Sequence, residues 1–171
     1  MTKPELASRL KSQYEQFADC ITGLSDEQFV ATPTGKWSAG QHAEHLLKSV
    51  APLNKVMQSR PVLESFGRAE HSSRDYDAIV VYYQETLAKG YEDRPQFLPA
   101  EVTAEQRAGL INKLLAEVDT LCELLTGYSE EDLDQLVIPH PLLGNLTIRE
   151  MMLFTAYHGY HHELGVRKIF E

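Results

Sequence analysis

Apolar residues recur at steps of three and four positions over four long stretches of this chain, which is the spacing of an amphipathic α-helix. The pattern predicts helices over residues 4–23, 39–59, 103–127 and from 147 nearly to the end of the chain. Helices of about 20 residues are about 30 Å long, and each of these carries one apolar stripe. We therefore predict an all-α four-helix bundle. The length of 171 residues favours a single domain over residues 1–171.

The predicted helices start at capping boxes, in which Ser or Thr is followed three residues later by a side chain that can hydrogen-bond back to it. Six such pairs occur along the chain: Thr2 and Glu5, Ser25 and Gln28, Ser38 and Gln41, Thr103 and Gln106, Ser129 and Asp132, and Thr147 and Glu150. Four of them open the long helices. The other two predict short helical turns.

The connection between the second and third long helices, residues 60–103, is much longer than the 2–8 residues typical between antiparallel neighbours. We predict a crossover along the bundle, which leaves these two helices parallel. The crossover contains a further helical pattern over 74–89, so it is partly helical. We expect a loop from His140 to Gly144, because too few residues with strand character remain for a sheet.

The charge balance argues against two classes of partner. Sixteen basic and 25 acidic residues give a net charge of −9, which disfavours nucleic acids and anionic membrane surfaces. No window approaches about 18 continuous apolar residues, and the first residues do not resemble a secretory signal. We expect a cytoplasmic protein. The tyrosines of the chain and the apolar pair Val80 and Val81 in the crossover suggest a patch for a homodimer.

The last predicted helix carries two histidines on its inward stripe. His158 and His162 are four residues apart, so their Cβ atoms lie about 5–6 Å apart on one face. Two imidazoles at that spacing can share one ion with bonds of about 2.0–2.1 Å. The alternative is that both are core histidines that hydrogen-bond to neighbours, and without a third ligand the two interpretations are evenly balanced.

A third ligand must come from another helix, and His45 on the buried side of the second helix is the best candidate. His42 lies one turn away but points towards the flank, where a solvated side chain is expected. His161 lies about 100° from the pair around its helix, so we place it at the surface or beside the ligands. His71 and His140 fall in expected loops, and we predict that both are solvated.

Two polar residues near these histidines have two interpretations each. Gln41 and Thr155 can line the same cavity as polar neighbours of the metal site. Alternatively, Gln41 belongs only to the capping box of Ser38, and Thr155 bonds to its own helix backbone. Three histidines with no obvious fourth protein ligand are typical of catalytic sites, and such sites suit zinc, nickel, iron or cobalt, which the sequence does not distinguish.

Three groups of residues resemble the DinB-like superfamily, which includes the YfiT-like metal-dependent hydrolases and the bacillithiol S-transferases. The groups are Gly35, Trp37 and Ser38 leading to His45 and Leu46; His140 to Thr147 with Glu150; and His158, His161 and His162. The resemblance implies a four-helix bundle with a long crossover, a divalent-metal site at His45, His158 and His162, and a Trp37 that packs at the end of the bundle. Gly165 departs from the family, since many relatives carry Gln there.

Three hypotheses for function follow. In the first, the chain is a metal-dependent enzyme acting on a small molecule, in which the metal lowers the pKa of a low-molecular-weight thiol or of water. Thiolate attack would give S-transfer, and hydroxide attack would give hydrolysis. In the second, the chain is a non-catalytic metal-binding or stress-related interaction protein. In the third it binds no metal, and the histidines are polar groups of the core.

Overall fold

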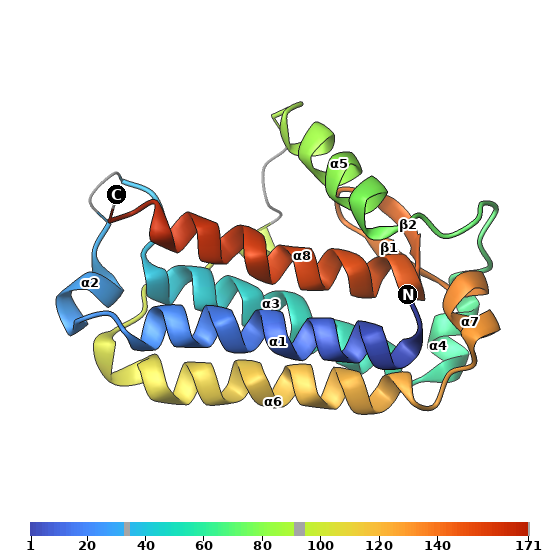
Figure 1. The fold of residues 1–171 in the computed structure, drawn as a ribbon, viewed down its shortest axis with the longest axis horizontal. Coiled ribbons are helices and arrows are strands. Elements are labelled where there is room, and N and C mark those ends of the chain that lie inside the picture. Colours follow the sequence, from blue (N-terminus) through green and yellow to red (C-terminus); the bar gives the residue numbers. More distant parts are fainter. Residues whose placement is uncertain (33–34, 91–94, 171) are drawn as a thin grey trace.

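The computed structural model describes residues 1–32, 35–90 and 95–170, and its architecture is a bundle of four long helices (Figure 1). These are α1 (Lys3–Thr22), α3 (Ala39–Met57), α6 (Arg107–Leu125) and α8 (Ile148–Arg167). Helix α1 packs against α6 and α8, and α3 packs against the same two helices from the other side. The predicted all-α bundle is confirmed. Among the described residues, no helix is long and apolar enough to cross a membrane.

Local hydrogen bonding fixes where the helices begin. All six predicted capping boxes are present. At the start of α3 the Ser38 hydroxyl accepts from the Gln41 backbone N–H at 3.2 Å, and Gln41 Oε1 accepts from the Ser38 N–H at 2.9 Å. Two boxes open the short helices α2 (Asp26–Val30) and α7 (Glu130–Gln135). The box at Thr103 opens a 3₁₀ turn, η2 (Ala104–Gln106), so regular α-helix begins four residues later than predicted.

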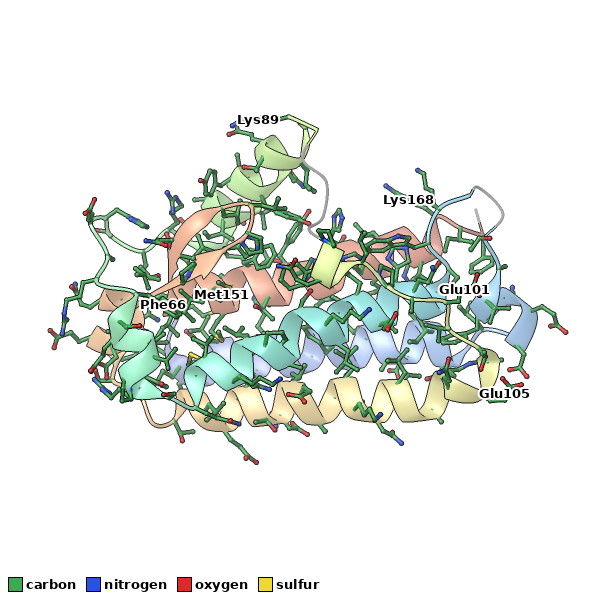
Figure 2. The ribbon with its side chains drawn as sticks, turned by 180° about the vertical axis from the view of Figure 1, so that it is seen from behind. Phe66, Lys89, Glu101, Glu105, Met151 and Lys168 are labelled. Atoms are coloured by element: carbon green, nitrogen blue, oxygen red, sulfur yellow. The ribbon has the colours of Figure 1, made fainter. Side chains whose placement is uncertain are left out.

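The segment between α3 and α6 is the predicted crossover. Colours in Figure 1 show α3 and α6 running in the same direction, with the connection returning along the bundle. It contains α4 (Arg60–Ser65), α5 (Tyr76–Leu87) and the 3₁₀ turn η1 (Pro95–Phe97). Helix α5 packs against α8, while Lys89 beyond its end projects away from the bundle (Figure 2).

The loop expected from His140 to Gly144 is the turn of a small hairpin, in which residues 141–143 connect two strands that were not predicted. Strand β1 (Val137–His140) pairs antiparallel with β2 (Gly144–Thr147), and His140 lies opposite Gly144. Gly144 has a φ of 71°, a conformation that glycine adopts without the steric penalty of a side chain. The two strands could not be predicted because four residues are too few to establish an alternating pattern in the sequence.

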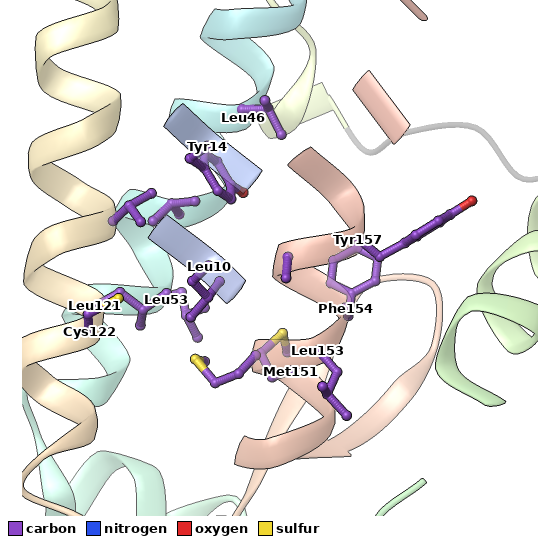
Figure 3. Packing of buried hydrophobic residues seen from close by; sticks show 14 of the residues in the cluster. Leu10, Tyr14, Leu46, Leu53, Leu121, Cys122, Met151, Leu153, Phe154 and Tyr157 are labelled. Atoms are coloured by element: carbon purple, nitrogen blue, oxygen red, sulfur yellow. The ribbon is translucent and has the colours of Figure 1, made fainter. Parts of the chain in front are cut away.

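Helix α8 is the centre of the core. Every residue from Met151 to Gly159 is buried, on all sides of the helix rather than on one stripe. Helices α1 and α3 cover one side, and α5 and the hairpin cover the other. Figure 3 shows Leu10, Leu46 and Leu53 on the bundle side of Met151 and Phe154. Polar side chains on this helix are therefore removed from water, and they include the two predicted ligands.

Candidate metal centre

Three buried imidazoles meet between α3 and α8. His45, His158 and His162 are 3%, 5% and 6% exposed, and one nitrogen from each lies within 4.8 Å of the other two. His158 Nε2 is 3.2 Å from His45 Nε2 and 2.9 Å from His162 Nε2. Two nitrogens bound to one ion at 2.0–2.1 Å lie about 2.9–3.4 Å apart when the angle between the bonds is about 90–109°. The spacing of these nitrogens therefore fits a shared metal ion.

Hydrogen bonds alone do not satisfy this arrangement. His45 Nδ1 lies 2.8 Å from the Phe97 carbonyl oxygen and donates its proton to it, so Nε2 of the neutral ring carries a lone pair. His158 Nε2 faces both other Nε2 atoms, yet a single N–H can donate to only one of them in a good geometry. A cation would accept lone pairs from all three rings, so the donor set fits a divalent ion.

Burial favours the neutral form of the His158 and His162 rings. Desolvation, reinforced by repulsion from His45 and other nearby histidines, lowers the pKa of His158 well below its usual value. The pKa of His162 is also lowered well below its usual value, again by burial first and then by the neighbouring rings. Metal ligation needs the neutral imidazole, and the lowered pKa values of His158 and His162 favour that form at neutral pH.

His42 lies beside the cluster, which corrects the prediction that it is solvated. Its ring is half-buried, and its Nδ1 is 2.7 Å from Nδ1 of His162. Burial lowers the pKa of His42 to about 4, so Nδ1 of the neutral His42 ring can accept a hydrogen bond from the N–H at His162 Nδ1. With its proton on Nδ1, the neutral His162 ring carries its lone pair on Nε2, the nitrogen that faces His158.

Gly165 explains why His42 can occupy this position. A Cβ atom at residue 165 would lie 2.9 Å from His42 Cε1, closer than real Cβ contacts. The absent side chain therefore gives the His42 ring its space against α8. The residue that faces His42 across the interface with α8 is a glycine, so this ring is half-buried rather than solvated. The burial of His42 therefore depends on the glycine at residue 165.

Trp37 covers the cluster rather than only packing at the end of the bundle. Its ring centroid lies 4.8 Å from that of His45, and it stacks on His162 with a centroid distance of 6.1 Å and an interplanar angle of 11°. The indole also meets His42 edge to face at 5.7 Å. The residue before the capping box of α3 therefore contacts rings from both helices.

Two cavities flank the histidines. The smaller has a volume of about 160 Å³ and is lined by His45 and His158 together with mainly apolar side chains of α3, α8 and the hairpin. The other has a volume of about 490 Å³ and lies on the side of Trp37 and His162, with Lys36 and Lys168 in its wall. The cluster is thus accessible to small molecules from two chemically different sides.

Gln41 follows the second of its two interpretations, whereas Thr155 fits both. Gln41 is engaged in the capping box of Ser38 and is not among the described residues that line either cavity. Thr155 donates its hydroxyl proton to the Met151 carbonyl at 2.7 Å, within its own helix. Thr155 also lines the smaller cavity, together with His45 and His158.

The three remaining histidines, His71, His140 and His161, differ in burial and in the groups that they contact. His161 is half-buried, with its ring edge-on to His162 at 5.2 Å. His71 is exposed, as predicted, although its Nε2 lies 3.1 Å from the buried carboxylate of Glu150. His140 corrects the prediction of a solvated side chain: it is half-buried, its Nδ1 accepts two backbone N–H groups of the hairpin turn, and its ring meets Phe154 at 4.4 Å.

Comparisons with known proteins agree with this architecture. The family model of the DinB superfamily matches residues 9–164. The uncharacterized protein YuaE of Bacillus subtilis (strain 168) is 26% identical over 158 residues, which cover 88% of each chain. No solved structure matches. Since the family model spans most of the bundle, from α1 to the histidines of α8, the chain belongs to the DinB superfamily.

Proposed function

We propose that the chain binds one divalent metal ion through His45, His158 and His162 and uses it to catalyse a reaction of a small molecule. The observation that carries the proposal is the convergence of three buried imidazoles at Nε2 separations of 2.9 and 3.2 Å. Zinc, nickel, iron and cobalt all accept such a donor set.

A bound ion would supply Lewis acidity, which lowers the pKa of a low-molecular-weight thiol or of water and so provides a nucleophile for S-transfer or hydrolysis. The protein's own residues prepare the site. The Phe97 carbonyl orients the ring of His45, and His42 orients that of His162. Trp37 shields the cluster on one side, and the apolar cavity limits the access of water on the other.

The cavities favour an enzyme over a structural metal site. Structural sites are closed by four protein ligands, whereas three ligands beside an accessible cavity leave room for a substrate. Among the described residues, the group that can hold a metal ion contains three ligands. The alternative, a non-catalytic metal-binding or stress-related interaction protein, predicts that the metal-loaded protein turns over neither class of substrate.

The test is a paired assay of protein loaded with each of the four metals. One assay follows the coupling of a low-molecular-weight thiol to a chromogenic aryl halide, and the other follows the hydrolysis of chromogenic esters. We expect one activity in the wild type, its loss in His158→Ala and its retention in His71→Ala, which changes an exposed histidine. The enzyme proposal fails if neither rate exceeds that of His158→Ala with any of the metals.

Three further expectations stay predictions: a single domain over residues 1–171, a cytoplasmic location and a homodimer. The dimer can be stated most sharply, because Val81 on α5 is 51% exposed. Light scattering at micromolar concentration should give twice the mass of the chain, and Val81→Lys should shift it towards the monomer. A wild-type mass equal to that of one chain would contradict the predicted homodimer.

A further inference from the structure

The smaller cavity has mainly apolar walls, with the rings of His45, His140 and His158 among them. They come from α3, the hairpin and α8, with Tyr83 of α5 and Phe97 of η1 closing the sides. Leu53, Val56, Ile138, Met151 and Phe154 supply much of the surface. Among the described residues that line the cavity, none is Asp, Glu, Lys or Arg. A charged group entering the cavity would therefore lose its hydration without meeting an opposite charge from the protein wall.

The hydroxyl groups of the wall do not change this conclusion. Ser49 Oγ donates to the His45 carbonyl at 2.9 Å, and Thr155 Oγ1 donates to the Met151 carbonyl at 2.7 Å. Both hydroxyl protons are thus committed to helix backbone. What these two residues offer a ligand is weak acceptor capacity, which does not stabilise an anion.

The size of the cavity limits the ligand further. Its volume is about 160 Å³. An engineered apolar cavity of about 150 Å³ in another protein stays dry and binds benzene. An aromatic ring, or an aliphatic group of similar size, therefore matches this cavity in both volume and polarity.

We infer that this cavity binds an uncharged apolar group of about the size of a benzene ring, and that the substrate presents its reacting atoms from that group towards His45 and His158. The inference rests on the proposed function only for the second part, the orientation towards the histidines. The first part concerns the cavity itself and holds for the metal-free protein.

The test uses metal-free, chelator-treated protein and three probes that share one ring: benzyl alcohol, benzoate and benzylammonium. Binding is followed by the shifts of the methyl groups of Leu53, Val56, Ile138 and Met151 in nuclear magnetic resonance spectra. We expect saturable binding of benzyl alcohol with a dissociation constant of about 0.1–10 mM, and binding of both charged probes at least tenfold weaker. Equal or tighter binding of a charged probe, or no saturable binding of the alcohol, would overturn the inference.

A matched pair of variants locates the probe. Val56→Phe places a ring into the cavity from a half-buried wall position, whereas Val62→Phe makes the same change at an exposed position of α4. Benzyl alcohol should bind Val56→Phe at least tenfold more weakly and bind Val62→Phe as it binds the wild type. Unchanged binding to Val56→Phe would place the probe elsewhere and refute the assignment. If Val56→Phe does not fold, the probe series on the wild type still decides the ligand class.

The metal centre and the apolar cavity are tested by different outcomes. Loss of metal binding by the wild type would refute the proposed function and leave probe binding in the metal-free protein untouched. Metal binding without any site for benzyl alcohol would refute the inference about the cavity and leave the metal centre standing.

Discussion

Helices α6 and α8 have nearly equal lengths, but α6 buries only apolar residues, whereas α8 buries polar side chains in addition to apolar ones. The buried residues of α6 form one stripe, whose members are Ile111, Leu114, Val118, Leu121, Cys122 and Leu125. Helix α8 is enclosed between the bundle and the crossover, and its buried residues include Glu150, Thr155, His158, His162 and Glu163. The comparison separates two tasks. Helix α6 contributes stability through apolar burial, whereas α8 holds polar groups in the core at a cost that ligand binding would offset.

The largest expected effect is on metal binding by His158→Ala. Removal of a residue that only orients a ligand costs about 10–100-fold in metal affinity, so removal of a ligand should cost more than about 100-fold. Elemental analysis of untagged protein should find metal in the wild type and in His71→Ala but not in His158→Ala. Full metal occupancy in His158→Ala would abolish the distinction between the two helices.

The converse change on α6 should affect stability alone. Leu121 is fully buried, and Leu121→Ala should lower the free energy of unfolding by about 2–5 kcal/mol through lost burial and the cavity left behind. Urea unfolding measures this change, and metal titration under native conditions should give the affinity of the wild type. A weakening of metal binding comparable to that in His158→Ala would show that the two helices do not have separate tasks.

Two identical substitutions at glycines sharpen the comparison further. Gly165→Ala on α8 places a Cβ 2.9 Å from His42 Cε1, so the ring must move away from His162, and metal affinity should fall about 10–100-fold. Gly109→Ala on α6 meets no atom within 4 Å and should raise the free energy of unfolding by about 0.5–1 kcal/mol. Metal titration and urea unfolding of both variants test the pair. Equal metal affinities would show that His42 does not position His162.

A graded effect is expected in the dependence of stability on pH in the metal-free protein. The pKa values of His158 and His162 are lowered by burial, so the unfolded chain binds more protons than the folded chain below about pH 6.5. Stability should be level above pH 6.5 and should fall below it by about 1.4 kcal/mol per pH unit for each proton. Urea unfolding at pH 7.5, 6.5 and 5.5 measures the slope. His158→Gln with His162→Gln should reduce it, and an unchanged slope would contradict the pKa assignments.

The fold could be predicted from the sequence because its main signals are local. Capping boxes and apolar spacing depend on residues three or four positions apart, and both located the long helices to within a few residues. The crossover followed from the length of the segment between α3 and α6. The hairpin could not be predicted in the same way, because its short strands are stabilised by packing on α8 and carry little pattern of their own.

The residues of the candidate site also differ in whether local sequence signals could place them. The juxtaposition of His158 and His162 follows from their spacing on one helix. The place of His45 beside them follows from its position on the buried face of another helix. His42 could not be placed, because its burial depends on the missing side chain of Gly165 across the helix interface. The burial of His140 likewise depends on the hairpin and Phe154. Tertiary neighbours, rather than helical position, decided both cases.

Titration of untagged, chelator-stripped protein with Co²⁺ tests the metal centre most directly. Imidazole ligation in a site of low coordination number gives intense visible absorption, whereas hexaaqua Co²⁺ absorbs weakly. The account predicts saturation at one ion per chain in the wild type, and loss of the signal in each of His45→Ala, His158→Ala and His162→Ala. A spectrum of aqueous Co²⁺ throughout the wild-type titration, or the same saturation in the three variants, would contradict it.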